Sequence, residues 1–74
     1  MREIINKNWD YHFYEKNNLF FLSVSCGSVA IFEIIIELNE DEINHYNLFG
    51  LDYIDNLAKL IQYSPSTFTN RNIG

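Results

Sequence analysis

The longest regular pattern of apolar and polar positions runs from Asn39 to Tyr63 and has the period of an α-helix. With successive residues placed about 100° apart around an axis, the apolar side chains fall on one broad face. That face holds Ile43, Tyr46, Gly50, Tyr53, Ile54, Leu57, Ala58, Leu60 and Ile61. The opposite face holds His45, Asp52, Asp55, Asn56, Lys59 and Gln62. The pattern predicts one long amphipathic helix.

The ends of this helix carry local signals. Asn39 is a favourable N-cap, and Glu42 stands three residues on, as in a capping box. Glu40, Asp41 and Glu42 lie in the first turn, where negative charge interacts favourably with the helix dipole. These three acids therefore have a structural explanation. Gly50 lies inside the pattern and either bends the helix or breaks it; because the pattern continues without a phase shift, we expect one helix bent at Gly50. Pro65 follows the end.

The N-terminal half alternates with period two, which predicts β-strands. In the segment 8–15, one side carries Trp9, Tyr11 and Phe13, and the other carries Asp10, His12 and Tyr14. Two further strands are predicted over 19–25 and 29–38, with turns at Lys16–Asn18 and Cys26–Ser28. The segment 1–7 is either an extended lead-in or a short strand through Ile4 and Ile5.

Cross-strand pairs on one face set the expected register. The expected core pairs are Val24 with Ala30, Leu22 with Phe32, Phe20 with Ile34, Phe13 with Phe20, and Tyr11 with Leu22. The predicted fold is therefore α+β, a three-stranded antiparallel β-meander packed on one long C-terminal helix with a short extended tail. Residues 1–74 form a single domain with the meander at 8–38, the helix at 39–63 and the tail at 64–74, which Phe68 and Ile73 can pin back.

The composition suits a small domain in a reducing compartment. Of the 74 residues, 47% are hydrophobic, which is enough apolar surface to favour folding. The single cysteine, Cys26, excludes an internal disulfide. The N-terminus has no signal-peptide pattern, and the apolar runs are too short to span a bilayer. We therefore expect a cytoplasmic protein.

The net charge of the chain indicates which kinds of partner it can bind. A formal net charge of −5 argues against nucleic acid and against anionic membranes, and it favours a basic protein partner. The same charge can equally serve solubility alone.

Candidate catalytic groups are few. His12 and His45 are the two histidines, and neither stands at ligand spacing from other histidines, cysteines or carboxylates. Cys26 has no base near it in the sequence, and the three glycines form no phosphate loop. We expect no catalytic, metal or cofactor site and no enzyme activity.

Two surfaces are candidates for binding a partner. One helix covers one face of the sheet, so the other face would be left open. It would expose His12, Tyr14, Phe21, Ser23, Val29, Ile31, Glu33, Ile35 and Glu37, an apolar and aromatic surface typical of interfaces. The second surface is acidic and comprises Glu40, Asp41, Glu42, Asp52 and Asp55, along the start of the helix and its polar side. Changing Asp52 and Asp55 to Lys is expected to weaken partner binding and leave the fold intact. Alternatively the tail covers the sheet, or a homodimer buries it.

Four segments together resemble known proteins. They are Trp9-x-Tyr11; Glu37-Leu38-Asn39-Glu40-Asp41-Glu42; Gly50-x-x-Tyr53-Ile54-x-x-Leu57-Ala58-x-x-Ile61; and Pro65-x-x-Phe68-x-x-Arg71. In this order they resemble small immunity proteins of bacterial polymorphic-toxin systems, including contact-dependent growth inhibition. The resemblance implies a cytoplasmic inhibitor without catalysis that binds a cognate toxin, often a basic nuclease. The alternative function is a homodimeric structural or regulatory subunit of a larger assembly.

Overall fold

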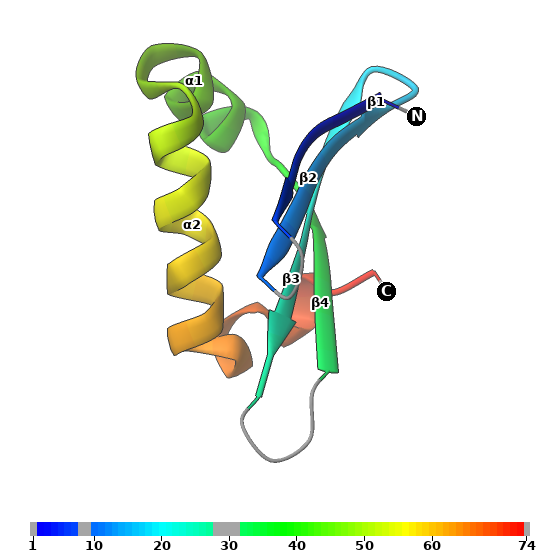
Figure 1. Ribbon diagram of the computed structural model, residues 1–74, viewed down its shortest axis with the longest axis vertical. Helices are drawn as coiled ribbons and strands as arrows, with labels where there is room; N and C mark the ends of the chain where they lie inside the picture. Colours follow the sequence, from blue (N-terminus) through cyan, green and yellow to red (C-terminus); the bar gives the residue numbers. More distant parts are fainter. Residues whose placement is uncertain (1, 8–9, 28–31, 74) are drawn as a thin grey trace.

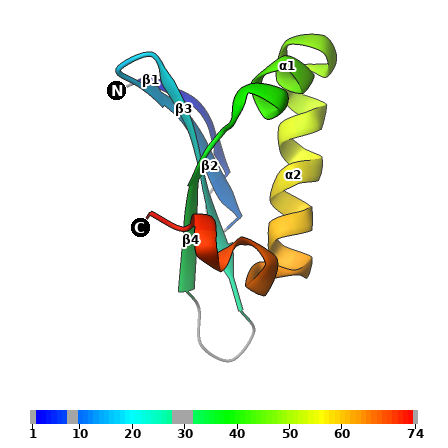
Figure 2. The same ribbon diagram turned by 180° about the vertical axis from the view of Figure 1, so that it is seen from behind.

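The computed structural model describes residues 2–7, 10–27 and 32–73. Its elements are β1 (Arg2–Lys7), β2 (Tyr11–Lys16), β3 (Leu19–Cys26), β4 (Phe32–Glu37), α1 (Glu40–Phe49), α2 (Leu51–Tyr63) and the 3-10 helix η1 (Pro65–Arg71). The strands form one antiparallel sheet in the order β1-β2-β3-β4. Both α-helices lie on the same side of this sheet, and α2 runs along it (Figures 1 and 2). The predicted three strands on one long helix are therefore wrong, although the α+β composition is not.

The additional strand is β1, and an irregularity explains why its pattern is hard to read. Glu3 pairs with Tyr14 and Ile5 pairs with Phe13, so the register shifts at Ile4. Such a bulge sets two residues against one on the partner strand. Ile4 and Ile5 consequently both pack against the core, although strict alternation would send them to opposite faces.

A two-residue turn joins β2 to β3. Asn17 and Asn18 both have positive φ, 54° and 65°, as the favoured hairpin turns require, and Asn tolerates this region better than most residues. The tight turn pairs Phe13 with Leu22 and Tyr11 with Val24. The predicted pairs were displaced by two residues, which leaves every side chain on its expected face.

The register between β3 and β4 also differs from the prediction. Leu22 pairs with Ile36 and Val24 with Ile34, a displacement of four residues that again preserves the faces. Phe32, expected in the core, lies at the end of β4 with 46% of its surface exposed. The predicted places of Trp9, Ser28, Val29, Ala30 and Ile31 fall outside the described residues.

Gly50 breaks the predicted long helix into α1 and α2. Its φ of 72° and ψ of −150° lie outside helical geometry, in a region that is essentially restricted to glycine. The Gly50 N–H still donates to the Tyr46 carbonyl at 2.7 Å, as in an α-helix, but the φ and ψ of Gly50 end α1 at Phe49. The expectation of one bent helix is wrong, and Leu60, expected on its buried face, is 52% exposed.

The capping box at the start of α1 is confirmed. The Glu42 N–H donates to the Asn39 side chain at 2.9 Å, and the Asn39 N–H donates to the Glu42 carboxylate at 2.9 Å. These bonds satisfy two donors that would otherwise lack helical partners.

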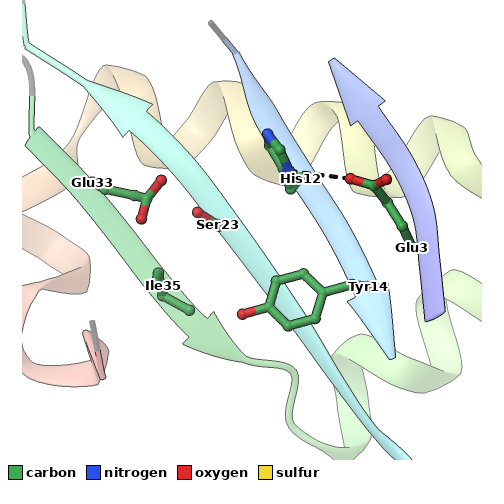
Figure 3. A pocket seen from close by; sticks show the side chains of 6 residues that line it. All are labelled: Glu3, His12, Tyr14, Ser23, Glu33 and Ile35. Carbon is green, nitrogen blue, oxygen red and sulfur yellow. Dashed lines mark ion pairs between the residues drawn. The ribbon is translucent and has the colours of Figure 1, made fainter. Parts of the chain in front are cut away.

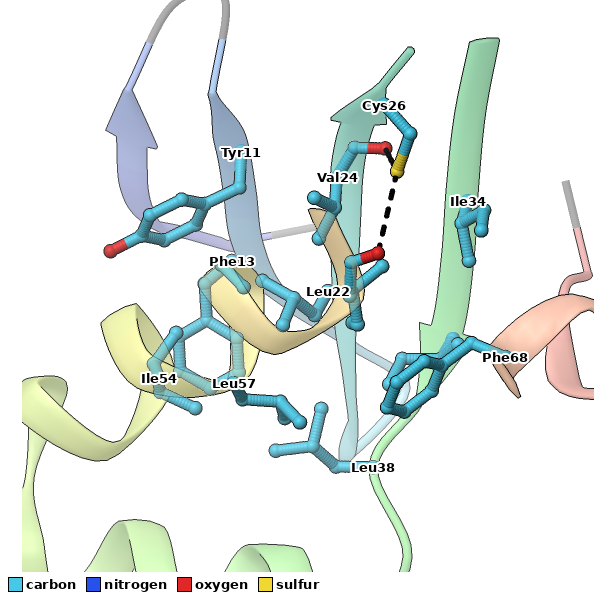
Figure 4. Close-up of a cluster of buried hydrophobic side chains, with 13 residues drawn as sticks. Tyr11, Phe13, Leu22, Val24, Cys26, Ile34, Leu38, Ile54, Leu57 and Phe68 are labelled. Carbon is cyan, nitrogen blue, oxygen red and sulfur yellow. Dashed lines mark hydrogen bonds between the residues drawn. The ribbon is translucent and has the colours of Figure 1, made fainter. Parts of the chain in front are cut away.

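The core lies between the sheet and α2, and the tail completes it (Figure 4). Its buried members are Tyr11, Phe13, Leu22, Val24, Cys26, Ile34, Ile36, Leu38, Ile54, Leu57, Ala58, Ile61 and Phe68. Phe68 comes from η1, so the tail is helical rather than extended, and its aromatic residue is buried as the sequence suggested.

The end of the chain covers the edge of β4. The Ile73 N–H donates to the Ile35 carbonyl at 2.8 Å, and the Ile35 N–H donates to the Asn72 side chain at 3.0 Å. The Arg71 guanidinium also donates to the Glu37 carbonyl at 3.0 Å. The side chain of Ile73 is largely exposed, so this residue attaches through its backbone. These bonds satisfy backbone groups that an edge strand leaves unpaired.

Candidate functional site

The sheet face turned away from α2, called here the outer face, carries four of the predicted binding residues. His12, Tyr14, Phe21 and Glu33 all lie on it, because the strand registers pair Tyr14 with Phe21 and place His12 beside Ser23. In Figure 3 the helices pass behind the sheet, and the labelled side chains stand in front of it. The structure thus brings these four residues together on one surface.

A shallow hollow of about 280 Å³ lies in this face. Ser23, only 7% exposed, occupies the middle of the lining, where its small side chain leaves space between larger neighbours. The remaining lining residues are Glu3, His12, Tyr14, Glu33 and Ile35. Four strands contribute to the hollow, so it depends on β1, which the predicted three-stranded sheet did not contain.

One wall of the hollow is aromatic. Tyr14 reaches across β3 toward β4 (Figure 3), and its ring stacks on Phe21 with 5.4 Å between centroids and 20° between planes. Burial raises the pKa of the Tyr14 phenol above its ordinary value, and the charge of Glu33 adds to this effect. The phenol therefore remains a neutral hydrogen-bonding group at physiological pH.

Carboxylates stand on opposite sides of the hollow. On β1, an oxygen of Glu3 lies 3.3 Å from Nδ1 of His12. On β4, Glu33 is exposed and has no ion-pair partner among the described residues. Glu3 was not among the predicted site residues, because only the pairing of β1 with β2 places it beside Tyr14.

The acidic residues predicted on the helix do not join this surface. Glu40 and Asp41 are exposed in the first turn of α1, and Asp52 is exposed in the first turn of α2. All three belong to the helical layer, across the core from the outer face. Glu42, also predicted on the acidic surface, is instead buried and paired with Arg71. The two predicted surfaces are therefore separate.

Asp55 is already engaged within the molecule. Its carboxylate accepts from Lys7 Nζ at 3.2 Å and from the Tyr11 hydroxyl at 3.2 Å, and it pairs with Lys59 at 3.1 Å. Hydrogen bonds from Lys59 and Lys7 lower the pKa of Asp55 below its ordinary value. This carboxylate ties α2 to β1 and β2, so it is less available to a partner than Asp52.

The candidate catalytic groups are dispersed. Cys26 is buried beneath α2, with Sγ 4.0 Å from the Ile61 carbonyl, and burial raises the pKa of its thiol. His45 stacks on Phe49 and Tyr53 in the helical layer, whereas His12 lies on the outer face. Within residues 2–7, 10–27 and 32–73, no group of three metal-binding side chains is present.

A further exposed apolar patch lies at the corner between the two α-helices. Leu48, Phe49 and Leu51 flank Gly50, and each is exposed. This patch was not predicted, because a continuous helix was expected across Gly50.

The fold and the hollow define a small α+β domain with one sheet face left uncovered by its helices. In comparisons with known proteins, no family model, no curated protein and no solved structure matches this chain. The resemblance to immunity proteins therefore stays a prediction. In the part of the chain that the structure describes, no helix is long and apolar enough to cross a membrane.

Proposed function

We propose that this chain is a non-catalytic protein-binding module, and specifically an immunity-type inhibitor that neutralises a basic toxin, such as a nuclease, by direct binding. The observation that carries the proposal is the outer face, where a hollow has the Tyr14 ring, stacked on Phe21, along one wall and carboxylates on opposite sides. The proposal places the protein in the cytoplasm, in keeping with its single, buried cysteine.

The chemistry of the outer face supports a cationic protein as the partner. Aromatic residues with polar tips are typical anchors of protein interfaces. The acids Glu3, Glu33 and Glu37 lie on strands of this face, and a basic partner would approach them favourably. The overall charge of −5 acts in the same direction over longer range.

The charge of the outer face also weighs against the alternative, a homodimer. Pairing two copies through this face would bring like carboxylates together, which is unfavourable. Pairing through β4 is blocked by the C-terminal residues on its edge. Pairing through β1 meets a bulge and the charged residues Arg2, Glu3 and Lys7, features that discourage strand addition.

The proposal assigns no reaction to the chain. His12 and His45 lie in different layers, and the thiol of Cys26 is buried with a raised pKa. These groups do not form the nucleophile-and-base pair that covalent catalysis needs.

The test is growth rescue. The toxin domain encoded beside this protein's gene is expressed in a bacterial host, alone and together with this chain. We expect coexpression to restore growth and the purified chains to form a complex that weakens with salt. Failure to rescue, or the lack of a neighbouring toxin gene, would contradict the immunity function.

Two matched charge reversals locate the surface. Glu33→Lys changes an exposed acid on the outer face, and Asp52→Lys changes an exposed acid on α2. We expect Glu33→Lys to abolish rescue and Asp52→Lys to preserve it. The opposite result would assign binding to the acidic helix surface and would refute the outer face as the site.

A further inference from the structure

We propose that the hollow in the outer face binds the guanidinium group of one arginine side chain from the protein partner. This inference rests on the proposed function and specifies what the outer face recognises. The occupant follows from the shape of the hollow, its aromatic wall and the placement of its two carboxylates.

The hollow has the size of a side chain rather than of a secondary-structure element. Its volume is about 280 Å³, and Ser23 lies in the middle of its lining. A long unbranched side chain entering from the solvent would place its methylenes against Ile35 and its end group beside Tyr14. In Figure 3 the carboxylates of Glu33 on β4 and Glu3 on β1 stand at opposite edges of the sheet with Ser23 and His12 between them. The Tyr14 ring lies over β3, to one side of this row.

Two of the polar groups around the hollow are carboxylates, which only accept, and the hydroxyls of Tyr14 and Ser23 can accept as well as donate. Glu33 has no ion-pair partner among the described residues, and Glu3 meets only His12. Removing Glu33 from water beneath an apolar or anionic ligand would be costly, because the carboxylate would lose its hydration without compensation. A cation with several donors compensates for that loss.

Arginine fits this arrangement better than lysine does. Its planar guanidinium carries five donors, can bond a carboxylate at two points, and stacks on aromatic rings. Tyr14, whose ring is held by stacking on Phe21, offers a fixed surface for such stacking. The compact ammonium of lysine has fewer donors and cannot stack in this way.

A second copy of this chain has no unpaired arginine to supply. The two arginines are Arg2, which pairs with Glu15 at 3.0 Å, and Arg71, which pairs with Glu42 at 2.6 Å. Arg71 also holds the β4 edge, so releasing it would disturb the fold. The arginine is therefore expected from a different, basic protein.

The experiment is an NMR titration of the full chain with the peptide acetyl-Gly-Arg-Gly-amide. We expect saturable amide shifts confined to the outer face, with a Kd of roughly 1–10 mM for a single partly exposed contact. The lysine peptide is expected to bind more weakly, and the citrulline peptide, which keeps the shape but lacks the charge, to produce no saturable shift.

Matched variants give the control. Glu33→Gln is expected to weaken arginine binding about tenfold by removing a charge-assisted hydrogen bond. Glu40→Gln removes an exposed acid in the other layer and should leave the Kd unchanged. Equal binding of the citrulline peptide, shifts outside the outer face, or no effect of Glu33→Gln would refute the arginine site.

Failure of the arginine inference can be distinguished from failure of the proposed function. If the arginine peptide does not bind but Glu33→Lys still abolishes rescue, the binding module stands and the arginine inference is wrong. If the peptide binds as expected but the toxin is not neutralised, the arginine site stands and the immunity function is wrong.

Discussion

Arg71 and Glu42 form a two-point ion pair that joins the end of the chain to the start of α1. Nη1 donates to Oε2 at 3.0 Å, and Nη2 donates to Oε1 at 2.6 Å. Glu42 is 8% exposed and also accepts from the Asn39 N–H, so one carboxylate serves both the capping box and the tail. Arg71 additionally holds the Glu37 carbonyl, which connects η1, α1 and β4.

Arg71→Ala is expected to lower the free energy of unfolding by about 2–3 kcal/mol, since it leaves a mostly buried carboxylate without its cation. Arg71→Lys should lose less, because lysine retains the charge but not the two-point geometry. Urea denaturation followed by circular dichroism measures both. Arg2→Ala, which breaks the exposed pair with Glu15, is the control and should change stability by less than about 1 kcal/mol. Equal losses for the Arg71 and Arg2 variants would contradict this assignment.

Gly50→Ala is expected to destabilise the protein by about 1–3 kcal/mol through backbone strain, because φ is 72° there. A Cβ at this position meets no atom within 4 Å, so steric crowding is not the cause. Chemical synthesis with D-alanine at position 50 separates the two effects, since D-residues favour positive φ. The D-alanine protein should be at least as stable as the wild type; a loss equal to that of the L-alanine protein would point to crowding instead.

Phe68→Ala is expected to lower the free energy of unfolding by about 3–5 kcal/mol, as for other buried aromatic residues. Ile73→Ala is the matched control, because its side chain is 62% exposed and only its backbone bonds to β4. We expect that control to change stability by about 0.5 kcal/mol or less. Comparable losses at the two positions would mean that the tail is held by something other than the Phe68 side chain.

Asp55 should make the protein sensitive to acid. Because its pKa is lowered in the folded state, its stabilisation is present above its ordinary pKa and is lost as pH falls through the lowered value. The stability difference between wild type and Asp55→Asn should therefore shrink between about pH 6 and pH 2. Urea midpoints across this range measure it, and a constant difference would show that the ion pairs with Lys7 and Lys59 contribute nothing.

The ion pairs of Asp55 with Lys7 and Lys59 also change what is expected of the two charge reversals on the helix, Asp52→Lys and Asp55→Lys. Asp52→Lys alters an exposed side chain, whereas Asp55→Lys would place a third cation beside Lys7 and Lys59. We therefore expect Asp52→Lys to leave the fold intact and Asp55→Lys to destabilise it, which revises the sequence-based expectation for Asp55. Loss of binding by the double variant would therefore reflect damage to the fold and would not assign the helix acids to the binding surface.

Local chemistry and alternation could be predicted from the sequence. The Asn39–Glu42 capping box depends on residues three apart, and the faces of β2, β3 and β4 follow from period two. Alternation also placed four of the candidate site residues on the correct face of the sheet, namely His12, Tyr14, Phe21 and Glu33. It fixes only whether a residue points in or out, because a register shift of two or four residues leaves the faces unchanged.

The remaining features depend on backbone geometry that alternation does not encode. The tight turn at Asn17 and Asn18 set the first register, and the bulge at Ile4 concealed β1 and with it the role of Glu3. Gly50 was recognised as a possible break, but the apolar angles continue across it, so the pattern favoured the wrong alternative. A glycine can adopt either a helical φ or a positive φ at little cost. Tertiary packing therefore decides which of the two occurs, and the local sequence does not.

Because η1 lies C-terminal to the sheet and α2 in the sequence, it is synthesised after them. Phe68 fills the core beside strands synthesised much earlier, and residues 71–73 satisfy the edge of β4. During translation the sheet and α2 emerge from the ribosome with that edge open and a gap where Phe68 belongs. This packing therefore cannot form until residues 65–73 appear, and until then the open edge of β4 can pair with a strand of another chain.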